Sequence, residues 1–200
     1  MKKNEKYNLE FESSRLKIKR LGAKHSKTIL DYKFRNFENH KLALPDRPGG
    51  FFKENIQKVI LEEEGKAFEN GTFIRFYIFS KYEWNNENII GDINIGDIKL
   101  GNISNCVIGV KIDSKHLRKG YAHEALETII DYLFSFLNLH SITANILPEN
   151  IASINLFEKL GFEREGISRH HMKTGGQWRD HIRYSLIKGA GLPPIIGEQS

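Results

Sequence analysis

Residues 106–133 combine an apolar stretch, a basic loop and an amphipathic stretch, and this succession constrains the fold more than any other part of the sequence. Cys106 to Ile112 is apolar and β-branched, which predicts a strand. Beyond the loop, apolar residues recur every three or four positions along one stripe, which predicts a helix. These residues are Ala122, Ala125, Leu126, Ile129, Ile130 and Leu133.

Arg118, Lys119 and Gly120 lie where this helix is expected to begin. The first N–H groups of a helix have no intrahelical acceptor and the helix dipole is positive there, so the position favours anions. Gly120 permits backbone conformations closed to other residues, and Ala122 is small enough for a diphosphate to lie against the backbone. The alternative is an ordinary strand-to-helix turn with a solvated basic pair, and the loop alone does not decide between the two.

The chain has 200 residues, 40% of them hydrophobic, which is enough for one well-packed domain. We expect that domain over residues 1–188 and a flexible tail at 189–200. The net charge of +5 is dispersed, so it permits a ribosomal neighbourhood without requiring one. Cys106 is the single cysteine and is expected to be a buried structural thiol, which fits a reducing cytoplasm. No apolar run reaches membrane-spanning length.

Local patterns predict the remaining elements. Strands are expected at 15–21, 73–80, 89–98, 140–147, 162–171 and 178–186, and helices at 23–35, 53–68 and 150–160. The helix at 53–68 is expected to place an apolar stripe of Ile56, Val59, Ile60 and Ala67 on one side. Residues 1–10 should be frayed, and 35–52, with its prolines and paired glycines, should be a loop. Short polar connections favour antiparallel pairing and the crossovers after 113 favour parallel pairing. The predicted fold class is α/β (α+β mixed), with a mixed sheet and helices on both faces.

Three segments together resemble the acetyl-CoA-binding core of the GNAT N-acetyltransferases: GVKID at 109–113, RKGYAHEAL at 118–126 and NILPENIASINLFEKLGFEREG at 145–166. In that family a Q/R-x-x-G-x-G/A loop holds the cofactor's pyrophosphate. Here the glycine and alanine match, and Leu117 replaces the leading Gln or Arg. The resemblance implies the GNAT fold, in which parallel strands splay apart and the pantetheine arm lies between them.

The same resemblance implies a set of contacts with acetyl-CoA. They comprise the strand backbone, the loop with the first turn of its helix, and the start of the next helix: Val110, Lys111, Ile112, Arg118, Lys119, Gly120, Tyr121, Ala122, His123, Asn150, Ser153 and Asn155. Asn150 is equally suited to cap its own helix, and the two roles are compatible. Glu124 is expected to order the helix start rather than to act as a base.

Further segments resemble the RimJ/RimL branch of the family, which acetylates the N-termini of ribosomal proteins. They are YKFRN at 32–36, RPGGFF at 47–52, IIGDINI at 89–95 and GGQWRDHIRYSL at 175–186. The branch implies acetyl transfer to a protein N-terminal amine, with possible ribosome association, by a monomer or homodimer. A free small amine, amino acid or antibiotic is the alternative acceptor. A third hypothesis is a cofactor- or nucleic-acid-binding module without catalysis.

Direct attack on the thioester needs a neutral amine and therefore a base. The candidates are His170, His171 and Asp180, with His181 beside them, although each alone is more often a structural or surface residue. No familiar metal-ligand spacing is present, so no metal is expected. Where many GNAT enzymes use a tyrosine to protonate the thiolate, this chain has Phe157.

The substitute for that tyrosine is Ser153, which is as readily a serine that only bonds the backbone. A backbone N–H near Val110 is expected to donate to the thioester oxygen. The acceptor site is expected between the loop at 35–52 and the C-terminal hairpin, with polar residues that suit a cationic amine: Asn36, Asn39, His40, Asp46 and Asp180.

Overall fold

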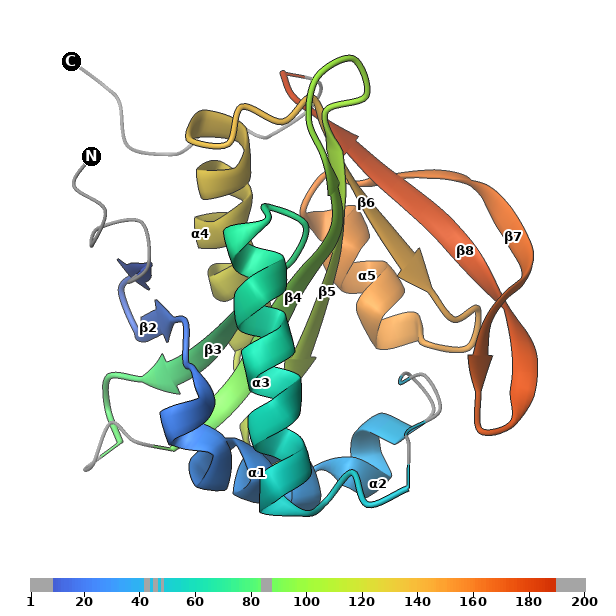
Figure 1. Cartoon of the computed structure of the whole chain (residues 1–200). Coiled ribbons are helices and arrows are strands. Elements are labelled where there is room, and N and C mark those ends of the chain that lie inside the picture. Colours follow the sequence, from blue (N-terminus) through green and yellow to red (C-terminus); the bar gives the residue numbers. More distant parts are fainter. Residues whose placement is uncertain (1–8, 42–43, 45–46, 48, 84–87, 190–200) are drawn as a thin grey trace, which may run out of the picture.

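The computed structural model describes residues 9–41, 44, 47, 49–83 and 88–189. Within these ranges the chain forms an eight-stranded sheet of order β1-β2-β3-β4-β5-β6-β8-β7 (Figure 1). The strands are β1 (Glu10–Glu12), β2 (Leu16–Lys19), β3 (Ile74–Ser80), β4 (Ile89–Lys99), β5 (Asn105–Ile112), β6 (Ser141–Ile146), β7 (Glu163–Thr174) and β8 (Gln177–Ile187). β5 and β6 are parallel and the other neighbours are antiparallel, so the expected mixed sheet is confirmed.

Helices cover both faces of this sheet (Figure 1). The helices are η1 (Ala23–His25), α1 (Ser26–Arg35), α2 (Phe37–His40), α3 (Glu54–Glu69), η3 (Ser114–His116), α4 (Tyr121–Ser135) and α5 (Ile151–Lys159). Side chains from α4 and α5 share one buried cluster with the sheet, while side chains from α1 and α3 share a second. We call these two sides the α4 face and the α3 face.

β3 shows how the sequence builds both layers. Phe76 and Ile78 belong to the cluster on the α4 face, and the alternate residues Tyr77 and Phe79 belong to the cluster on the α3 face. A strand buried on both faces is a continuous apolar run, as FYIF is here. Each of these side chains stabilises the fold by roughly 2 kcal/mol through burial.

The sheet opens at its one parallel junction. In the described chain β5 and β6 pair through three residues each, from Asn105 with Ser141 to Val107 with Thr143. Beyond that point β5 pairs with β4 alone, and β6 pairs with β8 alone. The expected splaying of the parallel strands is confirmed, and it leaves a gap through the sheet beside α4.

Most predicted elements are confirmed, with differences near the N-terminus. A short strand at Glu10–Glu12 precedes the predicted first strand, and residues 1–8 of the segment expected to be frayed lie outside the described residues. In the predicted loop at 35–52 the chain breaks the helix at Asn36, directly after α1, and then forms the short helix Phe37–His40. Residues 42–43, 45–46 and 48 of this predicted loop lie outside the described residues. Most of the predicted tail, at 190–200, also lies outside the described residues.

The inward face of α3 differs from the apolar stripe expected at 53–68. Val59 is 54% exposed, whereas Gln57 is fully buried beside Leu61. The Nε2 of Gln57 donates to the carbonyl oxygen of Phe51 at 2.5 Å, and Glu64 accepts from Arg75. This helix therefore presents polar side chains to the α3 face, because each of them has a hydrogen-bond partner there.

Candidate active site

The loop before α4 has the backbone conformation of an anion-binding turn. Gly120 has φ 78° and Arg118 has φ 59°, both in the left-handed region. The helical ladder begins with the N–H of Glu124 donating to the oxygen of Gly120, so the preceding N–H groups lie outside it. Left-handed residues near a helix N-terminus turn successive N–H groups toward a common centre. Leu117, which replaces the family's Gln or Arg, is exposed.

Arg15 from the β1–β2 turn adjoins this loop. Its Nη1 donates to the carbonyl oxygen of Lys119 at 2.9 Å, and its guanidinium lies 4.8 Å from the ring centre of Tyr121. Glu124 accepts from Arg15 through both the backbone N–H and Nε. The expected ordering role of Glu124 thus has a geometric basis, and Arg15 adds a third cation beside Arg118 and Lys119.

The first turn of α4 completes this end of the site. Tyr121, Ala122 and His123 are half-buried, and the Nδ1 of His123 lies 3.1 Å from a carboxylate oxygen of Glu127. All three therefore border the loop where the pyrophosphate was expected.

The gap between β5 and β6 is a cleft with a cavity volume of about 110 Å³. Val110 and Lys111 line it from β5, and Asn150 and Ser153 line it from the start of α5. The Oδ1 of Asn150 accepts from the N–H of Ser153 at 3.2 Å, so Asn150 caps the helix while facing the cleft. The structure thus brings together the two sides of the site that the resemblance implied.

Two residues expected to contact the cofactor are not among those that line the cleft. Asn155 is exposed and is absent from the residues that line the cleft, because it falls on the outer side of α5. Ile112 belongs to the buried cluster on the α4 face, and its carbonyl oxygen lies 3.0 Å from the Nε2 of His40. That carbonyl oxygen is therefore already engaged on the α3 side.

His181 is the histidine that the structure places in the cleft. Its neighbour Ile182 packs in the α4-face cluster, so by strand alternation His181 lies on the α3 face of the sheet. Burial lowers its pKa, the bond to Arg179 opposes this, and nearby His171 lowers it further. Nδ1 lies 3.2 Å from the carbonyl oxygen of Arg179, which fits a proton on Nδ1 and leaves Nε2 as an acceptor.

The other three candidate bases have different surroundings. His170 and Asp180 are exposed, and the N–H of His170 donates to Oδ1 of Asp180 at 2.8 Å. This bond spans a bulge where the pairing of β7 and β8 shifts between Ser168 and Met172 and where His170 has φ 47°. His171 is also exposed, and its ring centre lies 5.3 Å from that of His181. The geometry therefore gives Asp180 a structural role and makes His171 a neighbour of the cleft.

Three other residues define the chemistry of the cleft and its core. The Oδ1 of Asn145 is buried and makes no hydrogen bond with the described residues, although the residue lines the cleft. Phe157 is buried and lines the cleft, and its ring offers no proton. Burial raises the pKa of the Cys106 thiol to about 12, so this residue is a core side chain as expected, not a nucleophile.

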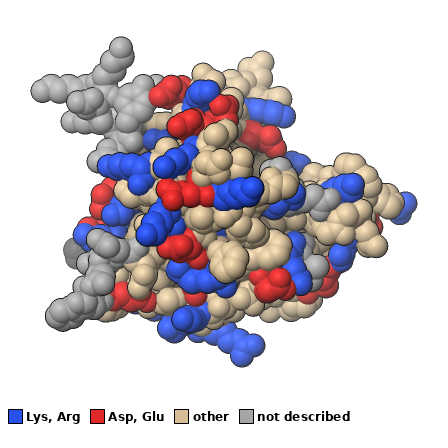
Figure 2. All heavy atoms as spheres, turned by 60° about the horizontal axis from the view of Figure 1, so that its bottom comes forward, with Lys and Arg blue, Asp and Glu red and all other residues tan. Residues whose placement is uncertain are grey.

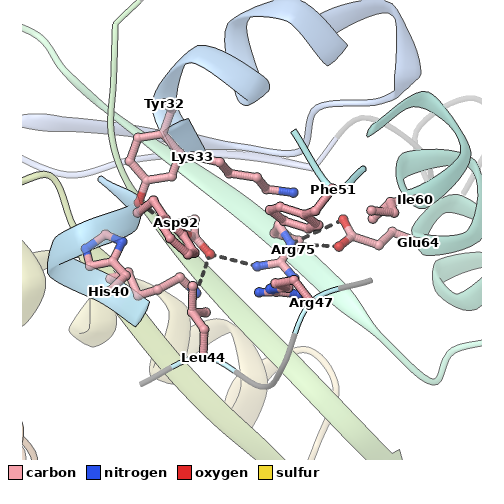
Figure 3. Close-up of a pocket in the computed structure, with 12 residues that line it drawn as sticks. Tyr32, Lys33, His40, Leu44, Arg47, Phe51, Ile60, Glu64, Arg75 and Asp92 are labelled. Carbon is pink, nitrogen blue, oxygen red and sulfur yellow. Dashed lines mark hydrogen bonds and ion pairs between the residues drawn. The ribbon is translucent and has the colours of Figure 1, made fainter. Parts of the chain in front are cut away.

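A second cavity lies on the α3 face between α1, α3 and the sheet (Figure 3). Its floor carries Asp92, whose Oδ2 lies 2.7 Å from Nη1 of Arg75 and 3.0 Å from Nζ of Lys111. Burial alone would raise the pKa of Asp92, but the two cations lower it overall. Tyr32 donates to the other oxygen at 2.9 Å, and Glu64 pairs with Arg75 from α3.

Two more cations face this cavity. The Nζ of Lys33 donates to Oε1 of Gln57 at 2.9 Å, and the guanidinium of Arg47 lies 4.7 Å from the ring centre of Phe51. Burial and the charge of Arg75 lower the pKa of Lys33 to about 8. The basic lining differs from the site for a cationic amine that we expected here.

Of the polar residues on which that expectation rested, His40 lines the cavity. Asn36 instead donates from Nδ2 to Asp113 at 2.8 Å, and Asp46 lies outside the described residues.

The surface and composition of the described chain add three findings. Figure 2 shows Lys and Arg interspersed with Asp and Glu over the visible face. Within the described ranges, we find no helix with the length and apolar character needed to cross a bilayer. The same ranges contain no grouping of three or more His, Cys, Asp or Glu side chains suited to hold a metal ion.

Comparisons with known proteins point to one family. The family model for the acetyltransferase (GNAT) domain matches residues 33–163. A curated relative, the [ribosomal protein uS5]-alanine N-acetyltransferase of Escherichia coli strain K12, is 34% identical over 110 residues, which are 55% of this chain and 57% of that protein. The chain spans about 60% of the length of the curated relatives it matches first.

Solved structures share the fold over most of the chain. The ribosomal-protein-S5-alanine acetyltransferase from Vibrio fischeri superposes with a TM-score of 0.83 at 27% identity, covering 92% of this chain and all of that one. Mycobacterium smegmatis RimJ, solved in complex with CoA-disulfide, has a TM-score of 0.78 at 20% identity and covers 88% of this chain and 85% of its own. The second likeness shows a common fold.

Proposed function

The chain belongs to the GNAT acetyltransferase family, and from that premise we propose that it transfers the acetyl group of acetyl-CoA to the N-terminal amine of a protein. The observation that carries the proposal is the cleft between β5 and β6, which lies beside the helix whose N-terminal loop holds Arg118 and Gly120. Acetyl-CoA would supply the activated acetyl group. Two relatives are named as N-acetyltransferases or acetyltransferases of the alanine of ribosomal protein uS5 (S5), which supports a ribosomal protein as the acceptor.

The described residues fit such a cofactor. The loop, with its left-handed residues and three cations, suits a diphosphate. A Cβ at Gly120 would lie 3.2 Å from the guanidinium of Arg15, so glycine leaves this space open. The unpaired Oδ1 of Asn145 offers an acceptor for a donor group within the cleft. Val110 and Lys111 present strand backbone on the opposite wall.

We assign the proton transfer to His181. With the proton on Nδ1, its Nε2 is free to accept, and the residue lines the cleft together with Asn150 and Ser153. A neutral imidazole in this place can take the proton that the acceptor ammonium must lose before it attacks the thioester as a neutral amine. Ser153 lines the same cleft and would donate a proton to the departing thiolate, since Phe157 cannot.

Transfer of labelled acetyl groups to peptides tests the proposal. Peptides that carry ribosomal-protein N-termini should be labelled on the α-amine, while the same peptides with a blocked N-terminus should stay unlabelled. A panel of free amines and amino acids, run in parallel, tests the alternative acceptor. Labelling confined to that panel, or binding of acetyl-CoA without transfer to any acceptor, would contradict the proposal.

A further inference from the structure

The cavity on the α3 face carries more positive than negative charge. Four basic residues line it, namely Lys33, Arg47, Arg75 and Lys111, against two carboxylates, Glu64 and Asp92. Arg75 contacts both carboxylates, and Lys111 contacts one of them. The inner pair of cations is therefore neutralised within the protein.

The outer pair, Lys33 and Arg47, forms no ion pair with a carboxylate among the described residues, and Glu64 and Asp92 act on it only at longer range. Lys33 contacts an amide oxygen of Gln57, and both cations lie over the ring of Phe51, at 5.4 and 4.7 Å from its centre. Besides burial, the charge of Arg47 helps to lower the pKa of Lys33, as expected for two cations that repel each other. An anion that reaches both cations would reduce this repulsion.

The size and position of the cavity indicate which anion fits. Its volume is about 40 Å³, enough for a few water molecules or one carboxylate group. Lys111 lines both this cavity and the cleft between β5 and β6. His181 faces the same side of the sheet, so an acceptor whose amine reaches His181 approaches from the side on which the cavity opens.

We propose that this cavity binds a carboxylate of the acceptor, carried by an acidic residue close to the N-terminal amine that receives the acetyl group. The proposal rests on the function proposed above, because it assumes a peptide acceptor. Lys33 and Arg47 would bind the carboxylate, with Phe51 holding both cations in place. Glu64 and Asp92 keep Arg75 and Lys111 from adding further positive charge.

Paired peptides test the proposal with the full-length chain. Each pair shares an N-terminal alanine and differs by a single Asp or Asn at one of the second to fifth positions. The Asp peptide of at least one pair should have a kcat/KM about tenfold higher, mainly through KM, since the contact binds and does not react. Arg47→Gln and Lys33→Gln should each reduce this ratio.

Lys58→Gln is the matched control, because Lys58 is an exposed residue of α3 that pairs with Glu54. It removes the same charge outside the cavity and should keep the ratio. Coenzyme A affinity, measured for each variant, shows that the fold is intact. Equal rates for Asp and Asn in every pair, or a ratio that Arg47→Gln and Lys33→Gln leave intact, would overturn the proposal.

A free amino acid could present the same carboxylate, so alanine and alaninamide form a second arm. A preference for alanine that depends on Lys33 and Arg47, without transfer to any peptide, would support the carboxylate site while refuting the proposed N-terminal function. Acetylation of both peptides of every pair at one rate would leave that function standing and refute the site. The two proposals therefore fail by different results.

Discussion

Arg15 and Glu124 are 109 residues apart in the sequence, yet Nε of the arginine lies 2.6 Å from Oε2 of the glutamate. Glu124 also accepts from the hydroxyls of Ser13 and Ser14. Burial raises the pKa of Glu124, but these hydrogen bonds lower it overall, so the carboxylate stays charged. The pair fixes the β1–β2 turn against the first turn of α4 and holds a guanidinium beside the loop.

Replacement of Glu124 by Gln should weaken coenzyme A binding even though Glu124 is acidic. Loss of the charged partner frees Arg15 to leave the loop, and we expect the dissociation constant to rise about five- to tenfold. Glu127→Gln, one turn further along α4 and paired with His123, should change it little. Isothermal titration calorimetry measures both, and tighter binding by Glu124→Gln would contradict the role given to Arg15.

The loop cations should contribute through charge. Arg118→Glu combined with Lys119→Glu should lower coenzyme A affinity by at least about tenfold, and the loss should shrink as salt is added because exposed charges are screened. Lys115→Glu, in the preceding η3 helix, is the control for a general change of net charge. Unchanged affinity in the double variant would refute the assignment of the pyrophosphate site.

Activity should depend on pH through His181. A histidine that acts as a base must be neutral, so kcat/KM should fall as pH drops through the pKa of His181. Burial lowers this pKa, so the acid limb of the pH profile should lie below the ordinary histidine value of about 6.5. His181→Gln should remove the limb and lower kcat about 100-fold. His170→Gln, on the exposed bulge, should retain both, and a retained limb in His181→Gln would mean that another group is the base.

Acid stability should depend on Asp113. Burial raises its pKa, but bonds from Asn36, Lys115 and Arg35 lower it to about 2. A depressed carboxyl pKa stabilises the fold fully above the unfolded value of about 3.9, and the contribution is lost as pH falls toward about 2. Asp113→Asn should therefore cost on the order of 2 kcal/mol at neutral pH.

Denaturant unfolding at several pH values measures this cost. The difference in the free energy of unfolding between Asp113→Asn and the native chain should shrink as pH is lowered from the unfolded pKa of about 3.9 toward the folded pKa of about 2. Asp131→Asn, at a solvent-exposed position of α4 where the carboxylate accepts from Ser135, should show a small difference at every pH. A constant deficit for Asp113→Asn down to the lowest pH would contradict the linkage.

The central part of the fold could be predicted because its signals are local. The apolar period of α4 and the position of Gly120 follow from neighbours three or four residues apart, and both predictions are confirmed. The family resemblance added the splayed strands, which no local pattern contains. The contact of Arg15 with the loop joins distant segments and could not be inferred from either of them.

Two features of the structure could not be predicted from local sequence patterns. Alternation assigns His170 and His171 to opposite faces of a regular strand, whereas the bulge between Ser168 and Met172 breaks that alternation. The inward face of α3 was misjudged because buried polar residues with partners, such as Gln57, look like surface residues in a sequence. Both features border the proposed acceptor side.

Because β5 and β6 pair through only three residues each in the described chain, a bound cofactor would also stabilise the sheet at this junction. A pantetheine arm lying in the gap would connect the two parts of the sheet, β1 to β5 and β6 to β8, where the strands no longer pair with each other. Without the cofactor the two parts of the sheet would be free to move relative to each other. With the gap filled, the distance between His181 on β8 and Lys111 on β5 would be fixed. Binding of acetyl-CoA would thereby set the distance between the residues that the acceptor amine approaches.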